Sequence, residues 1–110
     1  MAVTTEPIGD DVVAFRIDGR LNMVSAPDLR SAVNRALAGD RPKIVIDLSA
    51  VTFMDSAGLG VLIACLKTAR QAGGDVRISA PSEQVAMVLS LSNVDQILTP
   101  FESAEAAYRD

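Results

Sequence analysis

The first feature of this 110-residue chain that could carry chemistry is a serine beside an aspartate. Residues 54–58 read Met-Asp-Ser-Ala-Gly, and the Ser-x-Gly part also belongs to the nucleophile elbow of α/β-hydrolases. A serine nucleophile of that kind needs a histidine as its general base, and the chain contains no histidine. The sequence therefore excludes a serine–histidine hydrolase.

Ser56 itself has two interpretations. It can be an N-cap or first-turn residue of a helix, a role worth about 1 kcal/mol relative to alanine. It can also be a phosphoacceptor, because a phosphate at the start of a helix meets the positive end of the helix dipole. The residue types permit both interpretations, and both remain open at this level.

Two aspartates near the same strand end, Asp47 and Asp55, form a second candidate site. Paired carboxylates can perform acid–base chemistry. The stronger interpretation is structural, with Asp55 capping the following helix and Asp47 closing its loop by accepting backbone N–H bonds.

Gly58 and Gly60 could open a dinucleotide-binding fingerprint, which needs a third glycine three residues later. That position is Ile63, and no Walker-type lysine follows. The glycines instead indicate a close approach by the sheet or by a partner backbone, since each costs a helix about 1 kcal/mol relative to alanine. With no histidine and no nucleotide loop, we expect neither a cofactor nor a metal ion.

Three apolar residues, Met23, Val24 and Met54, stand in the turns before the first two predicted helices. They are either tucked beneath their loops or form a patch for a partner, and the sequence does not decide between these alternatives. The single cysteine, Cys65, falls in the apolar half of its predicted helix and is interpreted as a core residue.

The composition favours a single domain over residues 1–110. Hydrophobic residues make up 49% of the chain and charged residues 22%, which provides a core and excludes disorder. The net charge is −4, so we expect no nucleic acid as partner. The longest apolar run, residues 58–66, falls short of the ~20 residues of a membrane span. Without a signal-peptide pattern, we expect a cytoplasmic protein.

The elements that must position these residues follow from their periodicity. Alternating apolar residues at 13–17 predict a half-buried strand, with residues 2–6 as its antiparallel hairpin partner. Ser25 has the spacing of a capping box, and the apolar stripe behind it predicts a helix that ends at Gly39, before a turn at 40–42.

The remaining predicted elements are a central strand at 43–48, a helix at 56–72, a strand at 76–79, a helix capped by Ser82, a strand at 96–99 and a short helix from Ser103 to Tyr108. The order ββαβαβαβα is typical of an α/β fold with an N-terminal hairpin, a mostly parallel sheet of four to five strands and about four helices. Sites in such sheets gather where strands end and helices begin, which singles out a loop at 49–56.

Four stretches carry a resemblance to a known family. Residues 45–49 (VIDLS) and 51–62 (VTFMDSAGLGVL) resemble the sporulation-type anti-sigma factor antagonists of the STAS domain family. Residues 19–23 (GRLNM) match that family's loop before the first helix, and residues 71–78 (QAGGDVRI) match its link into the fourth strand. The resemblance therefore implies a STAS fold.

The resemblance also implies a partner switch and not an enzyme. In such members the unphosphorylated antagonist binds an anti-sigma factor that is also a GHKL-type serine kinase, and this frees the sigma factor. The kinase then phosphorylates the serine of Asp-Ser-x-Gly, here Ser56, and a phosphatase restores binding. ATP and Mg²⁺ would belong to the partner. The implied partner-binding residues are Asn22, Met23, Val24, Met54, Asp55, Ser56, Ala57, Gly58, Leu59 and Gly60.

One position departs from the family pattern. Asn22 stands where many members have an aspartate, and an amide keeps the hydrogen-bond geometry while it loses a charge. Other STAS proteins are accessory subunits of lipid-transport ATPases or scaffold subunits of stress-signalling complexes, and these roles form the alternative hypothesis.

Overall fold

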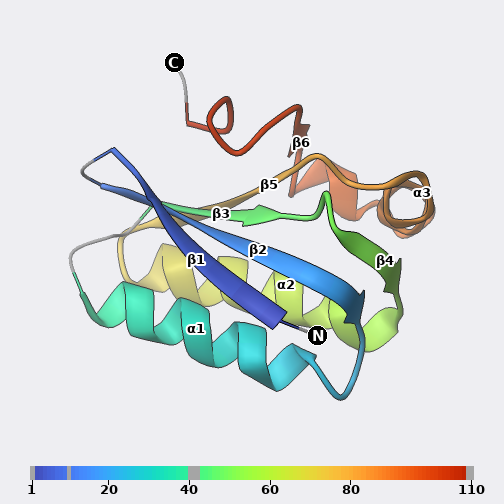
Figure 1. Ribbon diagram of the computed structural model, residues 1–110, viewed down its shortest axis with the longest axis horizontal. Coiled ribbons are helices and arrows are strands. Elements are labelled where there is room, and N and C mark those ends of the chain that lie inside the picture. The colour runs from blue at the N-terminus through green and yellow to red at the C-terminus, as the bar shows by residue number, and fades with distance from the viewer. Residues whose placement is uncertain (1, 10, 40–42, 109–110) are drawn as a thin grey trace.

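The computed structural model describes residues 2–9, 11–39 and 43–108, and it shows a mixed β-sheet with helices packed against it (Figure 1). β1 (Ala2–Ile8) and β2 (Val12–Leu21) form the predicted antiparallel hairpin. The remaining strand pairs of the described chain are parallel, in the order β1-β2-β3-β5-β6, with β4 beside the end of β2. The predicted α/β class is confirmed.

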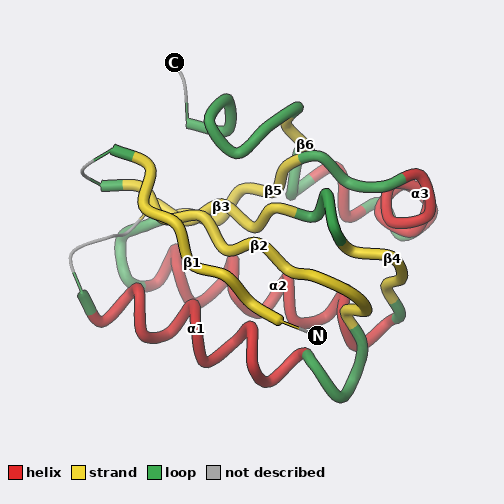
Figure 2. Tube along the Cα trace, viewed as in Figure 1, coloured by secondary structure: helices red, strands yellow, loops and turns green. Residues whose placement is uncertain are grey.

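The central strands and the three α-helices of the described residues lie close to their predicted positions (Figure 2). The strands are β3 (Lys43–Asp47) and β5 (Asp75–Ser79), and the helices are α1 (Ala26–Ala38), α2 (Ser56–Gln71) and α3 (Glu83–Leu91). The turn predicted at 40–42 lies outside the described residues.

The main core lies between the sheet and the pair α1 and α2, which run side by side across one face (Figure 1). Their apolar stripes are fully buried there at Leu29, Val33 and Leu62, each 0% exposed. Cys65 is 1% exposed in the same cluster, which confirms its core role. The opposite face carries a smaller cluster, which joins Ala107 near the C-terminus to Val45 of β3.

Residues 51–54 form a strand, β4 (Val51–Met54), which corrects the prediction of a loop at 49–56. β2 pairs with β3 as far as Arg16 and with β4 from Gly19 onward, and the register of the β2–β4 ladder shifts between Gly19 and Arg20. Gly19 adopts a φ of 105°, a backbone conformation that favours glycine. β4 thus pairs with the end of β2 that extends past the β2–β3 ladder, a contact between distant segments that a local pattern does not reveal.

The predicted strand at 96–99 is also wrong. Val94–Gln96 form a single 3-10 turn, η1, and the last strand is the short β6 (Pro100–Phe101). Leu98, in the middle of the predicted strand, is 1% exposed and belongs to the main core. Its burial produced the apolar signal that was interpreted as a strand.

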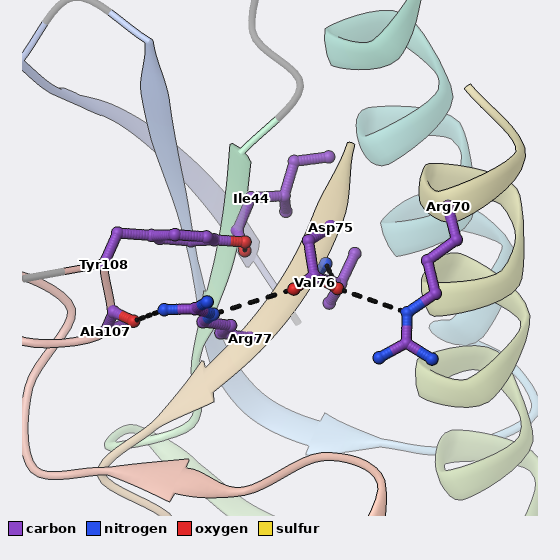
Figure 3. A network of polar contacts seen from close by, with 7 residues as sticks. All are labelled: Ile44, Arg70, Asp75, Val76, Arg77, Ala107 and Tyr108. Atoms are coloured by element: carbon purple, nitrogen blue, oxygen red, sulfur yellow. Dashed lines mark hydrogen bonds and ion pairs between the residues drawn. The ribbon is translucent and has the colours of Figure 1, made fainter. Parts of the chain in front are cut away.

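The predicted helix from Ser103 to Tyr108 is replaced by successive turns. Figure 3 shows what holds this segment on the sheet. The Tyr108 hydroxyl donates to the Ile44 carbonyl at 2.9 Å, and Arg77 donates to the Ala107 carbonyl at 2.6 Å. The Arg77 guanidinium also lies 4.3 Å from the centroid of the Tyr108 ring. Contacts with the sheet therefore decide the path of this segment.

The buried thiol of Cys65 predicts a loss of stability at alkaline pH. Desolvation raises the pKa of Cys65 from 9.0 to about 11, partly opposed by Arg30. The folded state therefore holds this proton more tightly than the unfolded chain, so the stabilisation is complete below pH 9.0 and is lost as pH rises towards about 11. We expect the urea midpoint to fall over that range. A smaller fall in Cys65→Ala would confirm the origin, and an equal fall would contradict it.

Candidate functional site

α2 begins directly after β4, and an aspartate fixes its first turn. The Asp55 carboxylate accepts a hydrogen bond from the Gly58 N–H at 2.9 Å. In the same way, the Asp47 carboxylate accepts a hydrogen bond from the Ser49 N–H at 3.0 Å. Both aspartates are thus engaged by their own turns, as the structural interpretation predicts. Ser56, the first residue of α2, is exposed.

Gly58 decides how closely α2 approaches β2. A methyl group at Gly58 would overlap the carbonyl oxygen of Leu21, the last residue of β2. The Asp55 N–H donates to the same carbonyl at 3.4 Å. The expected close approach to the sheet is therefore confirmed for Gly58. This approach places the start of α2 against the end of β2, next to the loop that leads into α1.

That loop is held by Asn22 and Ser25. The Oδ1 atom of Asn22 accepts hydrogen bonds from the Val24 N–H at 3.0 Å and the Ser25 N–H at 3.2 Å. The Ser25 hydroxyl accepts from the Asn22 N–H at 2.9 Å and donates to the Arg20 carbonyl at 2.8 Å. Ser25 is the N-cap residue of α1, as predicted, but the predicted capping bond of its side chain is absent, because the hydroxyl turns back into the loop.

An open groove of about 330 Å³ lies between the N-terminal halves of α1 and α2. It is lined by Met23, Ala26, Pro27, Arg30, Ala57, Gly60, Val61 and Ala64. A methyl group added at Gly60 would meet no atom of the described chain within 4 Å, so packing does not require glycine there. Gly60 thus adds no side chain to the groove, whose lining begins on α2 at Ala57, the residue after Ser56.

The predicted partner-binding residues divide into two sets. Met54 and Gly58 are buried and Leu59 packs against the core, so these three residues support the site from beneath. The exposed or half-buried ones are Asn22, Met23, Val24, Asp55, Ser56, Ala57 and Gly60. The question left open for the apolar loop residues is also answered: Met54 is tucked into the core at 1% exposure, whereas Met23 and Val24 are 74% and 82% exposed.

Two parts of the site could not be predicted from the sequence. The α1 wall of the groove, with Pro27 and Arg30, exists because α1 and α2 pack together. Gln84 of α3 hydrogen-bonds the backbone of Met54, just before Asp55. A glutamine in the first turn of an amphipathic helix carries no local signal of such a contact, which joins residues 30 positions apart.

Within residues 2–9, 11–39 and 43–108, no group of three or more His, Cys, Asp and Glu side chains is arranged to hold a metal ion. In the same part of the chain, no helix combines the length and the apolar character needed to cross a membrane.

Comparison with known proteins identifies the family. The STAS domain model matches residues 4–107. A candidate anti-sigma factor antagonist of Thermotoga maritima is 34% identical over 104 residues, which cover 94% of this chain and 92% of that protein. The anti-sigma-B factor antagonist of Bacillus subtilis is 29% identical over 86 residues, or 78% of each chain.

Solved structures agree with this assignment. An anti-sigma factor antagonist from Mycobacterium paratuberculosis superimposes with a TM-score of 0.82 at 30% identity, covering 99% of this chain and 96% of that one. Unphosphorylated SpoIIAA, at 23% identity, shares the fold with a TM-score of 0.81 over 96% of this chain and 92% of its own. The sequence match and the shared fold together show that this chain belongs to the STAS domain family.

Proposed function

We propose that this chain is an anti-sigma factor antagonist that works by partner switching, with Ser56 as its phosphorylation site. The observation that carries the proposal is an exposed serine at the first position of α2, directly before Ala57, which lines an apolar groove. Relatives that cover most of the chain are named as antagonists of anti-sigma factors. In this proposal the unphosphorylated chain binds an anti-sigma factor and thereby releases a sigma factor.

The proposed contact surface joins residues 22–24 to the start of α2. Met23 and Val24 expose 74% and 82% of their surface, and Met23 also lines the groove. Burial of such side chains against a partner gains roughly 25 cal/mol per Å² of apolar surface. Two neighbouring apolar side chains beside an apolar groove therefore favour another protein as the ligand.

Phosphorylation of Ser56 would change this surface while the fold persists. A phosphate carries a charge of about −1.5 to −2, and at the first residue of α2 it meets the positive end of the helix dipole. SpoIIAA, which shares the fold, is known in an unphosphorylated and a phosphorylated form, with TM-scores of 0.81 and 0.74 to this chain. The STAS fold is thus compatible with phosphorylation in that relative.

In this proposal the chain is the substrate of its partner and not itself an enzyme. The anti-sigma factor is a GHKL-type serine kinase that brings ATP and Mg²⁺, and a separate phosphatase removes the phosphate from Ser56. Sigma factors act on RNA polymerase, so the proposed role implies the bacterial cytoplasm.

The deciding experiment is a pull-down from the native organism with the unmodified chain as bait. We expect it to recover a GHKL-type kinase, and purified kinase with ATP should then phosphorylate Ser56 but not Ser56→Ala. Recovery of a lipid-transport ATPase or of a large stress-signalling scaffold would overturn the proposal in favour of the alternative STAS roles. Phosphorylation of Ser56→Ala at the wild-type rate would refute the assigned site.

A substitution at Asn22 tests what the partner recognises in the loop. Asn22→Asp keeps an acceptor oxygen for the Val24 and Ser25 N–H groups, so we expect a melting temperature close to that of the wild type. If the kinase recognises a carboxylate here, binding or phosphorylation should improve about tenfold, because a hydrogen bond to a charged group is worth roughly 1.5–3 kcal/mol. Titration calorimetry and a kinase assay measure both effects, and unchanged values would show that this position is not recognised.

The matched control is Asn22→Leu. It removes the acceptor oxygen from both N–H groups, and we expect it to melt several degrees lower than the wild type.

A further inference from the structure

In the described part of the chain β4 pairs with β2 alone, and a side chain engages the end of its other edge. Successive residues of a strand direct their backbone groups to opposite sides, and the Asp55 N–H points to Leu21 of β2. The backbone groups of Met54 therefore point away from β2. There the Oε1 atom of Gln84 accepts a hydrogen bond from the Met54 N–H at 3.2 Å, and its Nε2 atom donates to the Met54 carbonyl at 3.5 Å.

A glutamine is chemically suited to this position. Its primary amide offers one acceptor oxygen and N–H donors, the same pair of groups that a peptide unit of a neighbouring strand would present. Gln84 thus takes the place of a strand beside β4. Because both groups of Met54 are engaged by one planar amide, the contact restrains the orientation of the strand end as well as its position.

The amide is held on a well-anchored helix. The Ser82 hydroxyl caps α3 by accepting a hydrogen bond from the Val85 N–H at 3.4 Å. Val85 and Leu89 are 0% exposed in the main core, and α3 packs against β4 (Figure 1). Gln84 therefore restrains Met54 relative to the core of the protein.

Met54 lies two residues before Ser56, so its restraint reaches the proposed phosphorylation site. Its side chain is buried at 1% exposure, and the Asp55 N–H that follows it donates to the Leu21 carbonyl at 3.4 Å. We infer that Gln84 is a positioning residue: its amide holds the end of β4 so that the Ser56 hydroxyl is presented beside the groove in one orientation. This inference rests on the proposed function, because it concerns the same serine.

Gln84→Met is the direct test, because methionine has the length of glutamine and lacks both polar groups. Amide hydrogen exchange, followed by NMR, should become about tenfold or more faster at Met54, and Asp55, whose N–H donates to Leu21, should exchange faster as well. The rate of Ser56 phosphorylation by the kinase recovered in the pull-down should fall about tenfold. Gln84→Glu keeps an acceptor for the Met54 N–H and loses the donor, so we expect intermediate values.

Glu83→Gln is the matched control, since it changes an exposed side chain in the same turn of α3. It should leave exchange at Met54 and phosphorylation of Ser56 at wild-type rates. All three variants should melt within a few degrees of the wild type, because Gln84 is only half-buried.

The outcomes separate the inference from the proposed function. Wild-type exchange at Met54 in Gln84→Met would overturn the inference, and so would faster exchange with an unchanged phosphorylation rate. A wild-type chain that recovers no kinase would refute the proposed function instead, and exchange at Met54 would still decide whether Gln84 holds the strand end.

Discussion

Phosphorylated Ser56 should bind the anti-sigma partner about a hundredfold more weakly than the unmodified serine does, with a melting temperature that changes by only a few degrees. The fold tolerates the phosphate because it gains roughly 0.3–1 kcal/mol from the dipole of α2, part of which repulsion by Asp55 removes. The interface does not tolerate it, since an unpaired charge buried against a partner costs several kcal/mol. Titration calorimetry and thermal melts on both forms measure the two effects.

Two variants serve as controls for this switch. Ser56→Asp should weaken binding in the same direction, because it also places a charge at the exposed start of α2. Ser56→Ala should still bind, since Asp55 and not Ser56 supplies the capping bond, and it should resist phosphorylation. Equal affinities of Ser56 and phospho-Ser56, or loss of the fold on phosphorylation, would refute the mechanism.

The two glycines at the start of α2 should respond in opposite ways to alanine. Gly58→Ala places a methyl group against the Leu21 carbonyl, and we expect a loss of about 3 kcal/mol or more and a fall of roughly 10 °C or more in melting temperature. Gly60→Ala meets open space, and alanine is the better helix former by about 1 kcal/mol, so this variant should melt higher than the wild type.

A larger side chain at position 60 tests whether the groove beside Gly60 is the docking surface. Gly60→Leu should fold as stably as Gly60→Ala, and it should fill part of the groove and weaken partner binding about tenfold or more. Lys67→Leu adds the same side chain at an exposed position further along α2, and there we expect wild-type binding. If Gly60→Leu bound like the wild type, the groove would not be the docking surface.

Much of the fold could be predicted because its signals are local. The alternation at Val13, Phe15 and Ile17 and the stripes of α1 and α2 record which side of each element faces the main core, and all three elements lie where they were expected. The prediction that the strand at 13–17 is only half-buried is wrong, because Val12 and Ala14 on its other face are buried in the cluster with Ala107. The Asp55 cap could be predicted in the same way, because its carboxylate binds an N–H only three residues away.

The failed predictions share a physical cause. β4 pairs with the end of β2, at residues 19–21, and residues 103–108 follow a path set by contacts of Arg77 and Tyr108. In each case the deciding contact lies far along the chain, and 30 residues separate Arg77 from Ala107. A short stretch of sequence contains only one of the two residues that make such a contact. A prediction from that stretch therefore gives the conformation that the segment would prefer in isolation.

The sequence by itself determined the family and singled out Ser56 with its neighbours Asp55 and Gly58. It could do so because the residues of the Asp-Ser-x-Gly motif lie within one helical turn, where Asp55 binds the N–H of Gly58. Only the tertiary structure decided what each neighbour does. It placed Met54 in the core and Met23 in the solvent, distinguished a glycine that packing requires from one that it does not, and brought Gln84 to the end of β4. These properties depend on which surfaces meet when the helices pack on the sheet, and that information is distributed over the whole chain.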